Sequence, residues 1–135
     1  MAIAPILLSD GALDIQDDGP VLIGVRCTSC GTVAFPRSSI CSSCMSETLV
    51  DEPMPSCGNL YSWTSVHVGS PRMNKPITIG YVDLQNGVRV FSHLVARNRA
   101  LEVDQPVELS VAIVGRTEEG NPIQTFVFVP AERRQ

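Results

Sequence analysis

Beyond residue 57 the chain is a succession of short runs in which apolar and polar positions alternate. The runs are rich in Val, Ile, Phe, Tyr and Thr and are separated by Gly, Pro, Asn and Asp, a pattern that predicts β-strands joined by turns. They cover residues 60–68, 77–84, 88–95, 107–114 and 123–129. The run 88–95 has polar and apolar residues on both of its sides, which indicates an outer face that is partly covered. Val88, Val90 and Leu94 share one side of it, and Arg89, Phe91, His93 and Val95 share the other.

The turns between these runs indicate how the strands are arranged. Asn86-Gly87 is a strong signal for a tight hairpin, so the second and third runs are predicted to pair antiparallel. Five strands between residues 58 and 130, with no helix beyond a single turn around 98–102, predict an all-β, five-stranded barrel of the OB type.

The first part of the chain has a different organisation. Two β-type runs, 20–26 and 32–35, flank the sequence CTSCG, and residues 51–58 (DEPMPSCG) form a linker rich in proline. We therefore expect four parts: an extended N-terminal segment over 1–20, a metal-stapled module over 21–57, the barrel over 58–130 and a short tail over 131–135.

Two cysteine pairs with the same spacing predict a metal site. Cys27 and Cys30 form one Cys-x-x-Cys pair and Cys41 and Cys44 form the second, with ten residues between the pairs. Four thiolates complete the tetrahedral shell of Zn²⁺ and leave no open position, so the predicted ion is structural. The less favoured alternatives are disulfides and an iron–sulfur or redox role. Cys57 lies outside both pairs and is interpreted as a plain thiol at the linker.

The expected compartment and the charge pattern reduce the number of function classes that fit the sequence. The N-terminus lacks the basic start of a secretory signal, and no apolar run is long enough to span a membrane, so we expect a cytoplasmic protein with no membrane partner. Residues 1–57 hold seven acids against two arginines, a balance of −5, and residues 58–135 hold seven acids against eight bases, a balance of +1. With aromatic residues at 5%, this pattern argues against a nucleic-acid partner, although a single-strand-binding zinc-ribbon and OB protein remains an alternative.

Catalysis by the chain alone is not expected. The sequence has no nucleophile elbow, phosphate-binding loop or paired-carboxylate motif. Its two histidines, His67 and His93, fall inside predicted strands, where packing or surface roles are commoner than general-base roles. A free-standing small enzyme stays as a minor alternative.

Six short motifs follow one another along the chain: 26–31 (RCTSCG), 35–37 (FPR), 41–44 (CSSC), 58–64 (GNLYSWT), 81–84 (YVDL) and 87–88 (GV). This ordered set resembles the acyl-CoA-associated zinc-ribbon/OB-fold family, over roughly residues 22–129. The resemblance implies a rubredoxin-like zinc ribbon before the OB barrel, and a non-catalytic accessory subunit of a thiolase-type acyl-CoA complex that helps to form the acyl-CoA channel. A hot-dog-fold enoyl-CoA hydratase or a retro-aldolase is the alternative partner. The amphipathic N-terminal helix usual in the family is not evident here, and Cys57 replaces a small residue.

The same resemblance makes coenzyme A the expected ligand of the complex and directs attention to cationic side chains. Arginine binds phosphate bidentately and stacks on flat rings, while lysine acts as a point charge. The loop 69–76 joins the first two barrel strands, with Trp63 on the strand before it, and loops at a barrel mouth commonly contact ligands. For each of these residues a solvated surface or core role is the simpler reading. The candidates are Arg37, Trp63, Arg72, Lys75 and Arg97, with Arg99 beside them.

Overall fold

The computed structural model describes residues 6–7, 12–17, 19–97 and 100–131, and this part of the chain is built of strands without a helix. No helix long and apolar enough to cross a membrane occurs among these residues. The strands are β1 (Ile6–Leu7), β2 (Leu13–Gln16), β3 (Gly19–Cys27), β4 (Val33–Ala34), β5 (Leu49–Pro53), β6 (Cys57–Val66), β7 (Ile77–Leu84), β8 (Arg89–Leu94), β9 (Pro106–Arg116) and β10 (Pro122–Pro130).

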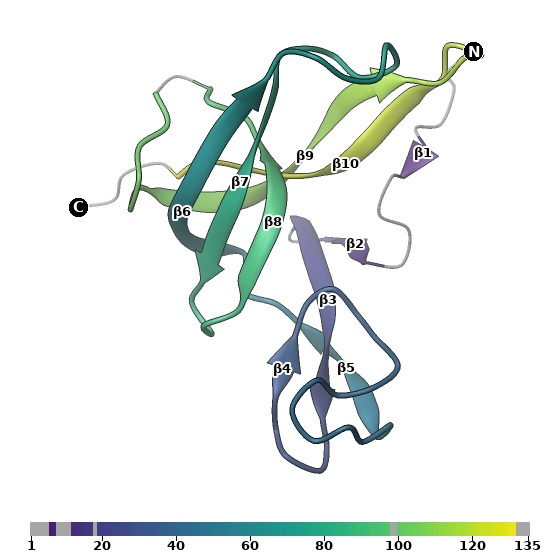
Figure 1. Ribbon diagram of the computed structural model, residues 1–135, viewed down its shortest axis with the longest axis vertical. Coiled ribbons are helices and arrows are strands. Elements are labelled where there is room, and N and C mark those ends of the chain that lie inside the picture. Colours follow the sequence, from purple (N-terminus) through teal and green to yellow (C-terminus); the bar gives the residue numbers. More distant parts are fainter. Residues whose placement is uncertain (1–5, 8–11, 18, 98–99, 132–135) are drawn as a thin grey trace.

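Strands β6 to β10 close into the predicted five-stranded OB barrel (Figure 1). The order around the barrel is β6, β7, β8, β10, β9 and back to β6. All pairs are antiparallel except β8 and β10, which run parallel where His93 faces Val127. The short β1 adds to β10 in parallel at its start. Closure leaves each barrel strand paired on both sides, as the OB type requires.

The hairpin predicted at Asn86-Gly87 is confirmed. Strands β7 and β8 pair antiparallel from Ile79 to Asp83, and Gly87 takes a positive φ of 88° in the turn. Along β8 the side chains alternate as expected, with Val90 and Leu94 buried and Phe91 exposed. Residues 98–99 of the predicted helical turn lie outside the described residues, and residues 100–102 are not helical.

The metal-binding module is organised around β3. This strand pairs with β2 near its start and with β4 and β5 near its end, in each case antiparallel. The β2 strand falls within the segment 1–20, whose other residues are only partly described, and its Leu13 is buried with 8% exposure. Leu13 faces Leu22 across the β2–β3 ladder, so burial of these two apolar side chains explains why this stretch is ordered.

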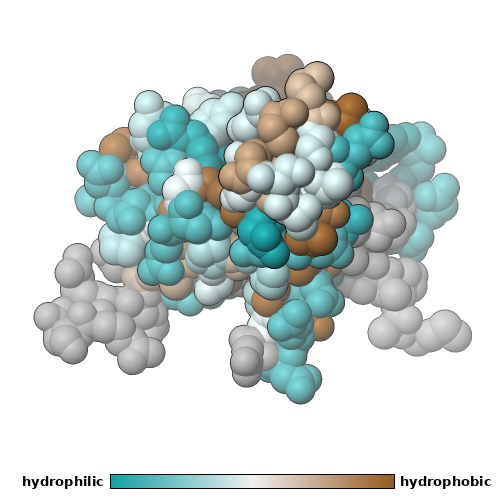
Figure 2. Space-filling view, turned by 90° about the horizontal axis from the view of Figure 1, so that it is seen from below, coloured by the Kyte–Doolittle hydropathy of each residue, from teal (hydrophilic) through white to brown (hydrophobic). Residues whose placement is uncertain are grey.

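The module and the barrel share one hydrophobic core. Leu22, within β3, and Met54, just after β5, belong to the same buried cluster as Leu60, Val82 and the other barrel residues. At the junction the rings of Phe35 and Phe126 meet edge to face, with centroids 5.9 Å apart. Figure 1 shows β3 running from beneath the barrel toward the far end of the module, and Figure 2 views the molecule from that end, where hydrophobic residues lie among pale and hydrophilic ones.

Candidate functional site

The four predicted cysteine ligands come together at the end of the module that is remote from the barrel. Their sulfur atoms all lie within 4.8 Å of one another, and two pairs, Cys27 with Cys44 and Cys30 with Cys41, are 3.6 Å apart. A tetrahedral ion with metal–sulfur bonds of about 2.3 Å places its sulfurs roughly 3.8 Å apart. The arrangement therefore has the size and shape of a zinc tetrathiolate.

Two matching turns position these ligands. In the first, the backbone N–H of Gly31 donates to the carbonyl of Cys27 over 2.8 Å, and in the second the N–H of Met45 donates to the carbonyl of Cys41 over 2.9 Å. Gly31 has φ of 81° and Met45 has φ of 67°, so both turns end in a left-handed residue. Both turns have the form of a zinc knuckle, with the residue after the second cysteine reversing the chain.

The thiols of the cluster are electrostatically coupled. The backbone N–H of Cys30 is the main cause that lowers the pKa of Cys27, to about 6, and the side chain of Thr32, 3.1 Å from the sulfur, lowers the pKa of Cys30. At Cys44 the backbone N–H of Ser46 favours the thiolate, but the neighbouring thiols and desolvation outweigh it and raise the pKa to about 12. Several thiolates this close together require a cation to compensate their charge.

The donor set fits a structural rather than a catalytic zinc ion. Cys27 and Cys41 are buried and Cys30 and Cys44 are exposed, and together they fill all four positions of a tetrahedral shell. In the part of the chain that the structure describes, this is the one group of three or more metal-type ligands. When bound, Zn²⁺ would fix the two knuckles relative to each other, and no coordination position would remain for a substrate.

A second site is a cleft on the barrel, about 580 Å³ in volume, between the β6–β7 loop and the β9–β10 hairpin. The side chain of Arg72 enters it and donates to the carboxylate of Glu118 over 2.6 Å. The loop is fixed on β9 by two backbone hydrogen bonds of 2.8 Å, from Asn74 to Val114 and from Arg116 to Arg72. Its lining residues are Ser70, Pro71, Arg72, Asn74, Arg116, Thr117 and Glu118.

Gly115 is the residue that lets this loop approach the barrel. A Cβ atom at this position would lie 2.2 Å from the backbone oxygen of Arg72, which is far inside contact distance. Met73 forms an isolated bridge with Gly115 at the same point. The loop carrying Arg72 is thus fastened to β9 by backbone contacts, and a site positioned in this way loses less entropy when a ligand binds.

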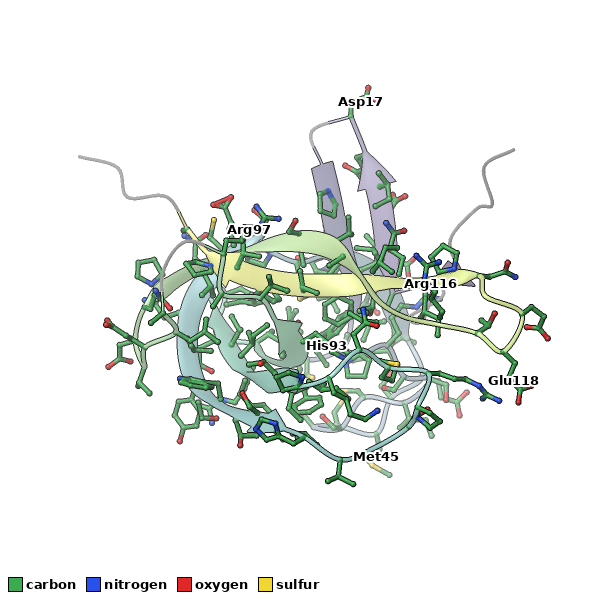
Figure 3. All side chains as sticks on the ribbon, turned by 90° about the horizontal axis from the view of Figure 1, so that it is seen from above. Asp17, Met45, His93, Arg97, Arg116 and Glu118 are labelled. Atoms are coloured by element: carbon green, nitrogen blue, oxygen red, sulfur yellow. The ribbon has the colours of Figure 1, made fainter. Side chains whose placement is uncertain are left out.

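The structure brings together some of the predicted ligand-contact residues. Arg72 lines the cleft, and the ammonium group of Lys75 donates to the carbonyl of Ser70 at the cleft's edge over 2.6 Å. Arg116 was not predicted. It follows the fourth apolar run directly, and only the pairing of the loop with β9 brings it to the cleft. Figure 3 shows Arg116 and Glu118 on one side of the barrel.

The other candidates lie elsewhere. Arg37 is on the cysteine-containing module, with its guanidinium 3.5 Å from the carboxylate of Asp51. Arg97 donates to the hydroxyl of Ser110 over 3.1 Å and is distant from Arg116 in Figure 3. Trp63 is on β6 with 42% of its surface exposed. Arg99 lies outside the described residues.

The remaining titratable candidates are dispersed. His67 is exposed just after β6, whereas His93 is half-buried on β8 and lines a small cavity of about 150 Å³. Desolvation by burial lowers the pKa of His93, so its neutral form is favoured. Cys57 is an exposed free thiol at the start of β6.

Comparison with protein-family models gives two adjacent matches. A model described as the ChsH2 rubredoxin-like zinc ribbon domain matches residues 20–50, and a model described as the ChsH2 C-terminal OB-fold domain matches residues 51–112. The first match contains the four cysteines, and the second contains the β6–β7 loop with Arg72. The two family models therefore confirm the predicted fold class, a zinc ribbon followed by an OB fold.

Individual proteins are also similar to the chain. The benzoylsuccinyl-CoA thiolase subunit BbsA of Thauera aromatica is 35% identical over 118 residues, which cover 86% of this chain and 82% of that protein. A DUF35 domain-containing scaffold protein of Methanocaldococcus jannaschii is 38% identical over 77 residues, 55% of each chain. A solved structure, the Ltp2-ChsH2(DUF35) aldolase, aligns with a TM-score of 0.67 at 26% identity, covering 83% of this chain and 86% of that one.

Proposed function

The chain belongs to the ChsH2 family of zinc-ribbon and OB-fold proteins, and we propose that it is the non-catalytic accessory subunit of a thiolase-type complex that processes acyl-CoA. The observation that carries this proposal is its 35% identity to a benzoylsuccinyl-CoA thiolase subunit across both modules. The site chemistry agrees with it, because four of the five cysteines form a closed metal shell. Thiolase chemistry needs nucleophilic and acid/base groups in one pocket, and a larger catalytic subunit would supply them.

In this proposal the accessory chain contributes to binding of the coenzyme A thioester. Coenzyme A carries phosphate groups, and arginines that line a cleft are suited to binding them. Arg72 and Arg116 line one cleft with the hydroxyls of Ser70 and Thr117, and Lys75 is at its edge. A bound phosphate would compete with Glu118 for the guanidinium of Arg72. Arg37, Trp63 and Arg97 lie outside this cleft and would make separate contacts in the channel.

We expect Arg72→Ala to weaken binding of the coenzyme A thioester to the complex roughly tenfold, which is the loss typical of one charge-assisted hydrogen-bonded contact. The reason is that Arg72 lines the cleft and 51% of its side chain is accessible to a ligand. Binding would be measured as the KM for the thioester, with assembly checked by gel filtration.

Arg26→Ala provides a matched control for that variant. Arg26 is a similarly exposed arginine (45% against 51%) with one acidic partner, Glu52 at 3.3 Å, but it lies on the ribbon. Its removal should leave the KM unchanged. Equal KM values for the Arg72 variant and the parent complex would contradict a role for this cleft in coenzyme A binding.

The proposed function itself is tested by isolating the complex. A tagged full-length chain expressed in its source organism should co-purify with a larger thiolase-like subunit. The pair should turn over a 3-ketoacyl-CoA repeatedly only when free coenzyme A is added, because breaking the C–C bond gives one thioester and leaves an acyl group, and the sulfur of free coenzyme A must take up that acyl group to form the second thioester. Turnover by the isolated chain, or by the larger subunit equally well alone, would contradict the accessory role.

A retro-aldolase partner is the second candidate, since the similar solved structure is an aldolase complex. Retro-aldol cleavage breaks a C–C bond of a hydroxyacyl-CoA and releases a carbonyl compound with one thioester. It consumes no free coenzyme A. Activity of the isolated complex without added coenzyme A would therefore favour this candidate over a thiolase.

A further inference from the structure

The two zinc knuckles differ at one residue in a way that their common geometry does not explain. Gly31 and Met45 occupy the same position after the second cysteine of each pair, and both have a left-handed φ, 81° and 67°. Glycine adopts this conformation without steric cost, whereas a side chain with a Cβ atom is strained there. Of the two knuckles, only the second therefore has a side chain at this position, and its backbone is strained there.

The side chain of Met45 is mostly exposed to solvent and packs little against the rest of the chain. Met45 is 72% exposed, more than any other large apolar residue of the described chain except Val68. Ile40, on the other side of Cys41, is 43% exposed, and a backbone bond of 2.8 Å from Cys41 to Ser46 holds the two flanks of the turn together. We call Met45 and Ile40 the knuckle tip. Figure 3 shows Met45 at the edge of the molecule.

The charge around the knuckle tip indicates what kind of surface it fits. On the ribbon, Arg26 and Arg37 are offset by Glu52 and Asp51, their ion-pair partners. Glu47, two residues from Met45, is exposed. Four thiolates around one Zn²⁺ carry two more negative charges than positive ones. The knuckle tip is thus an apolar point on an acidic module.

We propose that the knuckle tip is a docking anchor that inserts into an apolar socket rimmed by basic side chains on the catalytic subunit. This inference rests on the proposed function for the identity of the occupant. Methionine is enriched at protein interfaces and adapts its shape to irregular cavities. The strain at Met45 is then the consequence of placing an anchoring side chain on a turn whose backbone the metal fixes.

A second copy of the chain fits the knuckle tip poorly. Two such tips would bring like charges together, which opposes association. Two partly exposed side chains also supply only a fraction of the roughly 800 Å² per partner of a stable interface. The knuckle tip is therefore an anchor within a larger contact, for which a catalytic subunit has the necessary surface.

The test is Met45→Gly, because it should change stability and assembly in different directions. In the zinc-loaded free chain it relieves backbone strain, so the thermal midpoint should be unchanged or higher. Its affinity for the catalytic subunit isolated with the tagged chain should fall at least tenfold, measured by titration of the purified subunits. Met45→Leu should restore most of the affinity, and Glu47→Lys should weaken it with a reduced dependence on salt.

Val68→Gly is the matched control. Val68 is 84% exposed on the β6–β7 loop, so this variant removes an exposed apolar side chain far from the knuckle and should not alter the affinity. Unchanged affinity of the Met45→Gly chain would overturn the inference while leaving the accessory function intact. Loss of zinc or a lower thermal midpoint in that variant would overturn it in favour of a structural role. A parent chain that dimerises, and that the variant makes monomeric, would overturn the catalytic subunit as the occupant.

Discussion

Replacement of Cys27 by serine should eliminate stoichiometric zinc and unfold the ribbon. Cys27 ends β3, is fully buried and lies 3.6 Å from Cys44, so its replacement leaves three sulfur ligands in the cluster. Because ligand binding and folding are coupled in structural zinc sites, losing one of four thiolates should lower the zinc affinity by several orders of magnitude. Zinc content, expected to fall from about one ion per chain to almost none, would be measured with the thermal transition.

Cys57→Ser is the control for this prediction. Cys57 is an exposed free thiol at the start of β6 and is not part of the four-sulfur cluster. Its replacement removes one sulfur from the chain but should leave both the zinc content and the thermal midpoint unchanged. A Cys27→Ser chain that retained one zinc ion and the parent's midpoint would refute the structural assignment of the ion.

Replacement of Phe126 by alanine should lower the free energy of unfolding by about 3–5 kcal/mol, the range for a large aromatic side chain removed from a core. Phe126 is 7% exposed and belongs to the central cluster. It also forms the edge-to-face contact with Phe35 on the ribbon, so its loss weakens the barrel and the junction together. Urea unfolding followed by the fluorescence of Trp63, the chain's one tryptophan, would measure the change.

Phe91→Ala is the comparison for this variant. Phe91 is the same residue type, but it lies on the outer face of β8 with 54% exposure and contacts Tyr81 at 5.2 Å between centroids. Its removal should change the free energy of unfolding by no more than about 1 kcal/mol. Equal losses for the two variants would mean that the core does not extend to the ribbon junction.

The sequence predicted the local parts of the fold well, because local chemistry determines them. Asn86-Gly87 specified its hairpin without reference to the rest of the chain, and alternating runs marked the barrel strands. Pairings between distant segments were not accessible in the same way. The parallel contact of β8 with β10, and the antiparallel contact of β6 with β9 that closes the barrel, depend on how the closed barrel and the shared core bury apolar surface.

The candidate sites show the same difference between features set by local sequence and features set by contacts between distant segments. The four cysteines could be assigned because ligand number and spacing are fixed by the metal's coordination chemistry. The cleft could not, since Arg116 meets the loop of Arg72 only through backbone hydrogen bonds between segments 44 residues apart in numbering. The left-handed conformation of Met45 also has no signal in its residue type, because methionine seldom adopts it.

The β3 strand has a practical consequence for anyone who wishes to exchange parts between relatives. One end of this strand supplies Cys27 to the metal cluster, and its middle supplies Leu22 to the core beneath the barrel. A chimera joined between β5 and β6 would separate Leu13, Leu22, Phe35 and Met54 from the barrel side chains that share their core. A transplanted ribbon would therefore bring its own half of the interior with it, and grafts that keep the recipient's residues at these four positions should fold best.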